Sequence, residues 1–264
     1  MGGAATTQEE QEALARLERV HGPGGMKAAL LALLLVPDQP SRVRAWREET
    51  ALIGEAETLR ADVEQLSGAT RLPWFELLLA RLGSTPLPDR QELLRSARRV
   101  LTAAHPGLPI DRLMWLAMRR HFGENTHAMV HAPADADIAQ LPPADMLYVA
   151  HYTAHLARMV PSDDADAGQR WYHAVMARWL APAAVPAWHR PDVDQLVHSL
   201  TGLQALSWMQ RPQLVRAWVG EALPAGRPGP LPQTAADALR LSCLLMDSPM
   251  PPELARQYVE IPPS

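Results

Sequence analysis

The chain has 264 residues, and a chain of this length can bury roughly 70 to 75% of the surface that its unfolded form exposes, so it can form one large domain or two small ones without staples. Its 25 Lys and Arg residues against 29 Asp and Glu residues give a net charge of -4, which excludes a broad positive field for nucleic-acid phosphates. The single cysteine, Cys243, excludes a disulfide within the chain, and its apolar surroundings predict a small buried side chain.

Two segments near the start of the chain differ from export signals and membrane spans. Residues 1–19 contain Glu9, Glu10 and Glu12 where a secretory signal carries positive charge, so no export signal is predicted. The apolar run 28–36 stops before Pro37, whereas a membrane span needs ~20 apolar residues. We therefore predict a buried core helix at this run and no insertion of this region into a membrane.

The spacing of apolar residues predicts an all-α fold, a multi-helix bundle. In the stretch from Ser41 to Leu66, Leu52, Ala56 and Leu59 begin a series at alternating steps of four and three, which is one face of a helix. No alternating strand pattern occurs, and the 25 prolines fall mainly between helical stretches or in their first turns. Further helices are predicted at 89–104, 110–121, 146–159, 169–180, 193–207, 213–223 and 235–246.

The Pro-rich stretch 124–143 divides the chain almost in half and predicts a linker between an N-terminal subdomain, 1–123, and a C-terminal subdomain, 144–264. Each half closes with a helix, a Gly/Pro loop and a second helix. The first copy runs through the loop 105–109 and the second through the loop 225–229. This shared order suggests an internal repeat.

Three segments carry a resemblance to a known family. They are the apolar run 30–34, the segment Arg-Leu-Pro-Trp-Phe-Glu at 71–76, and the C-terminal stretch 244–252. Together with the helix-loop-helix pattern, they resemble the region that follows the peptidase domain in large bacterial membrane zinc metallopeptidases of the CAAX-protease type. Those regions are in turn similar to the tellurite-resistance TerB domain, so the resemblance implies two TerB-like helical subdomains.

The resemblance also implies where a metal would bind, and this chain departs from that pattern. A TerB-like loop holds an Asp-Gly pair and a later Glu, whereas the first loop here has His105-Pro106-Gly107, with only Asp111 near the later position. The second loop has no acid before Asp237. A hard cation needs several converging oxygen ligands, so no metal is predicted at either loop. The zinc-peptidase motif His-Glu-x-x-His is also absent, which would place any catalytic domain upstream.

Two histidines at helical spacing, His151 and His155, would place two imidazoles on one helix face, as zinc binding requires, with His173 as a possible third ligand. His127 and His131 form a second pair in a predicted loop. Ten histidines in a chain of this length make accidental pairs common, and we favour local hydrogen bonding beside a buried stripe.

The acidic run at Asp163, Asp164 and Asp166 before Gly168 is similar to the start of a calcium loop, but the later acids of an EF-hand are missing. Aspartates in this position are typical of a helix start, where they complement unpaired amides and the helix dipole. We therefore predict a capping run.

Eight tryptophans are the most unusual feature of the composition, and five lie in the second half: Trp171, Trp179, Trp188, Trp208 and Trp218. Most are predicted to lie in the core, although tryptophan is also enriched at binding hot spots. No serine lies in a glycine-flanked nucleophile elbow, so nucleophilic catalysis has no support.

These patterns lead to the expectation of a non-catalytic helical accessory or regulatory region of a larger zinc metallopeptidase, without catalytic, cofactor or metal residues of its own. The expected partner is another protein or the rest of its own full-length chain, not nucleic acid. Its expected location is the cytoplasm, tethered to the membrane where an upstream segment provides an anchor. The alternative is a free-standing helical protein that binds a partner through its Trp-rich second half.

Overall fold

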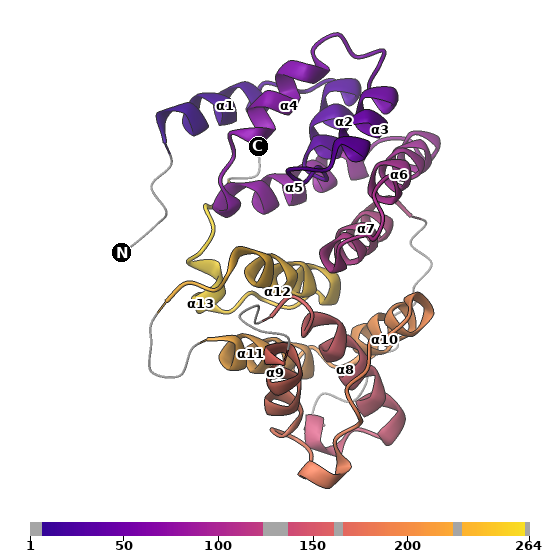
Figure 1. Cartoon of the computed structure of the whole chain (residues 1–264), viewed down its shortest axis with the longest axis vertical. Helices are drawn as coiled ribbons and strands as arrows, with labels where there is room; N and C mark the ends of the chain where they lie inside the picture. Colours follow the sequence, from indigo (N-terminus) through magenta and orange to yellow (C-terminus); the bar gives the residue numbers. More distant parts are fainter. Residues whose placement is uncertain (1–6, 124–136, 161–165, 224–228, 262–264) are drawn as a thin grey trace. The chain divides into compact units, whose positions relative to one another are not determined.

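The computed structural model of the chain describes residues 7–123, 137–160, 166–223 and 229–261. It is all-helical: the described residues form thirteen α-helices and two short 3-10 helices and contain no strand (Figure 1). The prediction of an all-α multi-helix fold is therefore confirmed. Over the same described residues, no helix is both long and apolar enough to cross a bilayer.

The chain divides into two compact units, one formed by Met1–Asn125 with Arg256–Ser264 and the other by Thr126–Ala255. The division falls inside the predicted linker 124–143. The predicted C-terminal subdomain, 144–264, differs from the second unit at its end, because residues 256–264 belong to the first unit. A main-chain hydrogen bond from Val259 N–H to the Ala69 carbonyl, 3.1 Å long, holds this segment there.

In the described part of the first unit there are seven helices, and α2 is their central element. This helix contacts α3, α4, α5 and α6, and its face from Ala28 to Ala32 is buried as the sequence predicted. The helices α6 and α7 pack against each other and correspond to the first predicted helix-loop-helix. The bounds are α1 Gln8–Glu18, α2 Pro23–Ala32, α3 Pro40–Glu49, α4 Ala56–Glu64, α5 Gly68–Gly83, α6 Leu87–Thr102 and α7 Pro109–Phe122.

The single helix predicted over 41–66 is wrong, because α3 ends at Glu49 and α4 begins at Ala56. The Thr50 hydroxyl donates to the Trp46 carbonyl, and Ile53 N–H donates to Thr50 O, which turns the chain between the helices. Leu52, which begins the predicted apolar face, is fully exposed in this turn. One side-chain bond and one main-chain bond thus stabilise the turn that ends α3.

The second unit contains the remaining helices, with α8 and α10 in the most extensive contact and α9, α11 and α12 packed around them. Gly202 of α10 allows this close approach, since a Cβ there would overlap the ring of Tyr148 on α8. The helices α11 and α12 pack together, as α6 and α7 do in the first unit. The bounds are η1 Ile138–Gln140, α8 Pro143–Leu156, α9 Ala167–Met176, η2 Pro182–Ala184, α10 Val193–Ala205, α11 Gln210–Ala222, α12 Gln233–Met246 and α13 Pro252–Ala255.

Candidate functional site

The two histidines of α8 lie in different environments. His155 is fully buried, whereas the partly exposed ring of His151 lies edge-on against the ring of His189, with centroids 5.0 Å apart. His173 of α9 lies against the ring of its neighbour Tyr172. Among the residues that the structure describes, no group of three His, Cys, Asp or Glu side chains could hold a metal ion. His127 and His131 lie outside those residues.

The His151–His189 contact favours a neutral imidazole. Partial burial lowers the pKa of His151 below 6.5, and the charge of a protonated His189 lowers it further, against an opposing effect of Asp192. The Nδ1 of His189 lies 3.2 Å from the Ala187 carbonyl oxygen. This pair therefore joins α8 to the loop before α10.

The acidic run before α9 is described only from Asp166 onward, so Asp163 and Asp164 lie outside the described residues. Asp166 occupies the N-cap position of α9, as the capping interpretation predicts, but its side chain makes no capping hydrogen bond to the first-turn amides. Gly168 lies against the backbone of Ala157, where a Cβ would overlap the carbonyl oxygen. Gly168 therefore allows close packing of α9.

The loop that the resemblance compares with a metal loop contributes its acid to a buried ion pair. Arg42 Nη1 donates to Asp111 Oδ1 at 3.0 Å, and Arg42 Nη2 donates to Asp111 Oδ2. The same carboxylate accepts the N–H of Leu108 at 2.7 Å, and Arg42 Nη1 also donates to the Leu34 carbonyl. These contacts connect the ends of α2, α3 and α7, which gives Asp111 a structural role.

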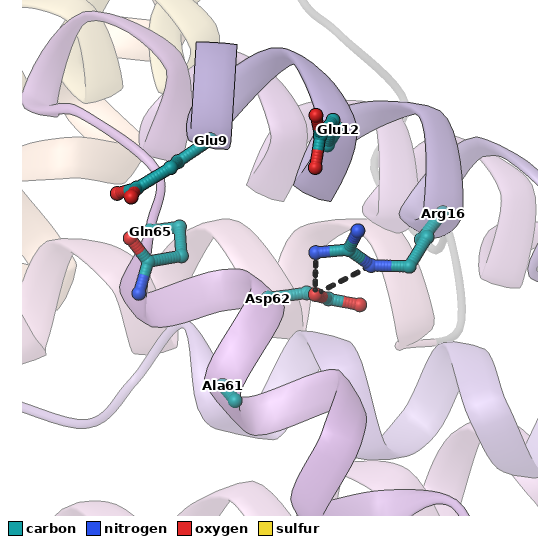
Figure 2. Close-up of a pocket in the computed structure, with 6 residues that line it drawn as sticks. All are labelled: Glu9, Glu12, Arg16, Ala61, Asp62 and Gln65. Atoms are coloured by element: carbon teal, nitrogen blue, oxygen red, sulfur yellow. Dashed lines mark hydrogen bonds and ion pairs between the residues drawn. The ribbon is translucent and has the colours of Figure 1, made fainter. Parts of the chain in front are cut away.

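A groove of about 310 Å³ lies between α1 and α4 in the first unit (Figure 2). Asp62 of α4 is buried, and its Oδ1 accepts from Arg16 Nε at 2.9 Å and Arg16 Nη2 at 2.6 Å. Glu9 and Glu12 of α1 are exposed at the rim. Because the buried Asp62 carboxylate is already paired with Arg16, we interpret the groove as a junction between two helices.

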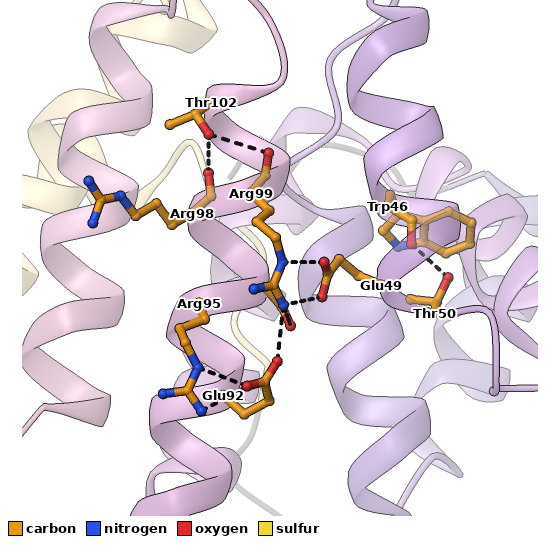
Figure 3. A network of polar contacts seen from close by, with 9 residues as sticks. Trp46, Glu49, Thr50, Glu92, Arg95, Arg98, Arg99 and Thr102 are labelled. Atoms are coloured by element: carbon orange, nitrogen blue, oxygen red, sulfur yellow. Dashed lines mark hydrogen bonds and ion pairs between the residues drawn. The ribbon is translucent and has the colours of Figure 1, made fainter.

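A second polar network joins α3 to α6 on the surface of the first unit (Figure 3). Arg99 donates through Nε and Nη2 to the two oxygens of Glu49 and through Nη2 to Glu92, which also pairs with Arg95. The Arg99 side chain is half exposed, so these ion pairs contribute little net stability. The network orients two helices and holds no reactive group.

The tryptophans of the second half differ in burial, and Trp179 and Trp188 are half-buried. Trp218 is fully buried, donates from Nε1 to Thr153 Oγ1 at 3.0 Å and lies 5.5 Å from the ring of Tyr152. Trp171 is also buried. Trp208, in contrast, is 68% exposed and is followed by Met209, which is 44% exposed. A large exposed indole beside a second exposed apolar side chain is an unusual surface feature among the described residues of this unit.

The turn that carries Trp208 and Met209 is held on both sides by a capping box. Ser207 N–H donates to Gln210 Oε1 at 3.0 Å, and Gln210 N–H donates to Ser207 Oγ at 3.2 Å. Both capping residues are buried, whereas the two residues between them point outward. The pattern Ser-x-x-Gln before an apolar run is a sequence signal for this turn.

The same turn is tied to the C-terminal end of α12. Arg211, which is buried, donates to the Met246 carbonyl at 2.5 Å, and Gln204 Nε2 donates to the Leu245 carbonyl at 2.7 Å. These bonds satisfy carbonyls that a helix end leaves without partners in the helix. The Trp208–Met209 turn, residues 207–210, is therefore a preorganised apolar projection and the candidate site.

Sequence reasoning predicted the cluster of tryptophans but not which of them faces outward. It also missed the capping box, although the spacing of Ser207 and Gln210 would have indicated it. Comparison with known proteins adds no relative to this picture, since no family model, curated protein or solved structure matches the chain.

Proposed function

We propose that the chain is a non-catalytic helical module that makes protein contacts and that the Trp208–Met209 turn is its contact surface. The observation that carries the proposal is the 68% exposure of Trp208 on a turn whose flanking residues are buried and hydrogen-bonded to each other. Indole side chains supply a large contact area with few rotatable bonds, and they dominate many protein interfaces.

The rigidity of the turn supports the same proposal. Ordering a side chain or loop during association costs free energy, and a preorganised contact surface avoids part of this cost. Both the capping box and the bonds of Arg211 and Gln204 to α12 hold the turn in place before a partner arrives. The partner surface that fits this chemistry is an apolar pocket able to enclose an indole and a thioether.

The resemblance to metallopeptidase accessory regions gives the proposal a finer form, in which the module serves a zinc peptidase domain encoded upstream and stays at the cytoplasmic side of its membrane. Reading the gene upstream of Met1 tests this form. A native start at Met1 without a peptidase in the same frame would contradict it and would favour the free-standing binding protein.

The contact surface is tested by replacing Trp208 with the photo-crosslinking residue benzoylphenylalanine in cells that express the protein. The matched control carries the same residue at Arg216, an exposed position two turns later in the same unit. We expect a discrete protein adduct from position 208 and none from 216. Adding Met209→Glu to the 208 variant should abolish the adduct, because a carboxylate would have to be desolvated in the apolar contact.

The absence of an adduct at 208, or the same adduct pattern at both positions, would contradict the proposed surface. An adduct of twice the mass of the chain would identify a second copy as the protein partner. Circular dichroism of each variant checks that the helical fold is retained.

A further inference from the structure

A proline inside α5 removes one hydrogen bond of the helix. Pro73 is in the sixth position of α5, Gly68–Gly83, and it has no N–H to donate to the carbonyl of Ala69, four residues earlier. The ring of a proline also clashes with the carbonyl four residues earlier and tilts that carbonyl away from the helix axis. The Ala69 carbonyl therefore needs a donor from outside the helix.

The C-terminal segment of the chain supplies this donor. Val259 N–H donates to the Ala69 carbonyl oxygen at 3.1 Å, and the preceding residue, Tyr258, is buried. The yellow end of the chain reaches the start of α5 in Figure 1. Although the helices just before it belong to the second unit, the segment from Arg256 onward belongs to the first unit.

The neighbouring donors at the start of α5 already have their acceptor. Glu10 Oε1 of α1 accepts from Ser67 N–H at 2.9 Å, Ser67 Oγ at 2.7 Å and Thr70 Oγ1 at 2.6 Å. Glu10 is an acceptor and offers no proton to the Ala69 carbonyl when it is ionised. The Ala69 carbonyl, one turn before Pro73, thus suits a main-chain N–H from a neighbouring segment.

We propose that Pro73 makes the start of α5 a docking site for a short peptide segment and that residues 256–260, a turn and a bend followed by irregular chain, are its resident, detachable latch. Arg256 and Glu260 at the two ends of the latch are exposed, while Tyr258 and the Val259 amide at its centre make the contact. Because the helical bonds of α5 do not depend on the latch, it can open without unfolding the helix. Once open, the site accepts another peptide with an aromatic residue before the donating amide.

Trypsin cleavage after the exposed Arg256 reports opening of the latch, since a protease needs an extended, released segment. The tested variant is Val259→Pro, which removes the donating N–H, and its matched control is Val259→Ala, which keeps it. We expect Val259→Pro to release the peptide 257–264 roughly fivefold to tenfold faster than Val259→Ala, the population change expected for one lost hydrogen bond. Free peptides with the same substitutions correct for any direct effect on trypsin.

A second variant acts on the helix side of the same bond. Pro73→Ala returns an N–H to α5 that competes with Val259 for the Ala69 carbonyl, so it should also accelerate cleavage after Arg256. Pro40→Ala is the control, because Pro40 is exposed at the first position of α3, where the N–H has no partner within the helix. We expect cleavage of this control at the wild-type rate.

The docking site itself is tested with a fluorescent peptide of residues 256–261 added to the intact chain. Fluorescence anisotropy should rise with the Val259→Pro chain, whose own latch is released, and much less with wild type. Equal cleavage of Val259→Pro and Val259→Ala would overturn the latch, even if Pro73→Ala failed to fold. Failure of the peptide to bind the Val259→Pro chain would overturn the docking site. Neither result bears on Trp208, so these experiments test the latch independently of the proposed function.

Discussion

Arg42 and Asp111 form a two-point ion pair in the core of the first unit, although 69 positions separate them in the chain. The Arg42 side chain is fully buried, and the Asp111 side chain is 10% exposed. Removing one partner of a buried ion pair lowers the free energy of unfolding, because the remaining charge stays in a medium of low polarity. The stability of the loop before α7 is therefore linked to α3.

Substitution Asp111→Ala should destabilise the protein by about 3 to 5 kcal/mol, since it leaves the Arg42 guanidinium buried without its counter-ion. The free energy of unfolding is measured by urea denaturation. The double substitution Arg42→Met/Asp111→Leu is the control and should recover most of this loss, because no charge stays buried. A single variant as stable as wild type would contradict the role of the pair.

Glu10 should make unfolding dependent on acidic pH. Burial alone would raise the pKa of Glu10, but hydrogen bonds from Thr70 and Ser67 outweigh it and lower this pKa below 4.5. A carboxyl group whose folded pKa is depressed adds stability above its unfolded pKa and loses it as the pH falls through the folded pKa. The difference in unfolding free energy between wild type and Glu10→Gln should therefore shrink with decreasing pH, and a difference that stays constant would contradict this role of Glu10.

His151 should add a second pH dependence at milder pH. Its pKa is lowered below 6.5 by burial and by His189, so the folded state binds its proton less readily than the unfolded state. The stability contribution is complete above pH 6.5 and decreases as the pH falls below this value. Urea unfolding between about pH 8 and about pH 5 measures the loss.

Substitution His189→Gln should reduce this loss, because it removes one of the two causes of the lowered His151 pKa. The matched control is the substitution His198→Gln, because the ring of the exposed His198 is hydrogen-bonded to the Asp194 carbonyl of its own helix. An unchanged pH profile in His189→Gln would show that the ring contact has no electrostatic effect.

Two glycines in helices of the second unit should respond in opposite directions to alanine. A Cβ at Gly168 would overlap the Ala157 carbonyl oxygen, so Gly168→Ala should destabilise by about 1 to 3 kcal/mol through forced separation of the backbones. Gly220, within α11, has open space around its Cα, so Gly220→Ala should stabilise by about 0.5 to 1 kcal/mol through helix propensity. Thermal unfolding of both variants measures the contrast, and a stabilising Gly168→Ala would show that α9 leaves room for a Cβ beside the Ala157 carbonyl.

Helix prediction succeeded where the apolar spacing and the end signals agreed. The helix predicted at 193–207 corresponds to α10, which begins with the Asp192–Gln195 capping box. It failed over 41–66, where spacing suggested a continuous face but Thr50 and Gly54 belong to a turn. The prolines were predicted to lie mainly between helices or in their first turns; Pro73 lies deeper inside α5, where an external donor compensates for the missing bond.

Spacing also placed His151 and His155 on one helix face without deciding what each ring contacts. The contacts depend on segments that come together only in the folded chain, as when the loop before α10 brings His189 to His151. For the same reason, the spacing of Asp111 in a metal-like loop did not reveal that Arg42 occupies its carboxylate.

The amino-acid sequence by itself determined the all-helical class and most helix positions, because periodicity, capping and proline effects act over a few residues. Only the tertiary structure decided that Asp111 pairs with Arg42, that Val259 serves the carbonyl beside Pro73, and that Trp208 faces outward while Trp218 is buried. Each of these outcomes depends on which distant segments bury a group or form a hydrogen bond with it. The local spacing of residues does not determine those contacts.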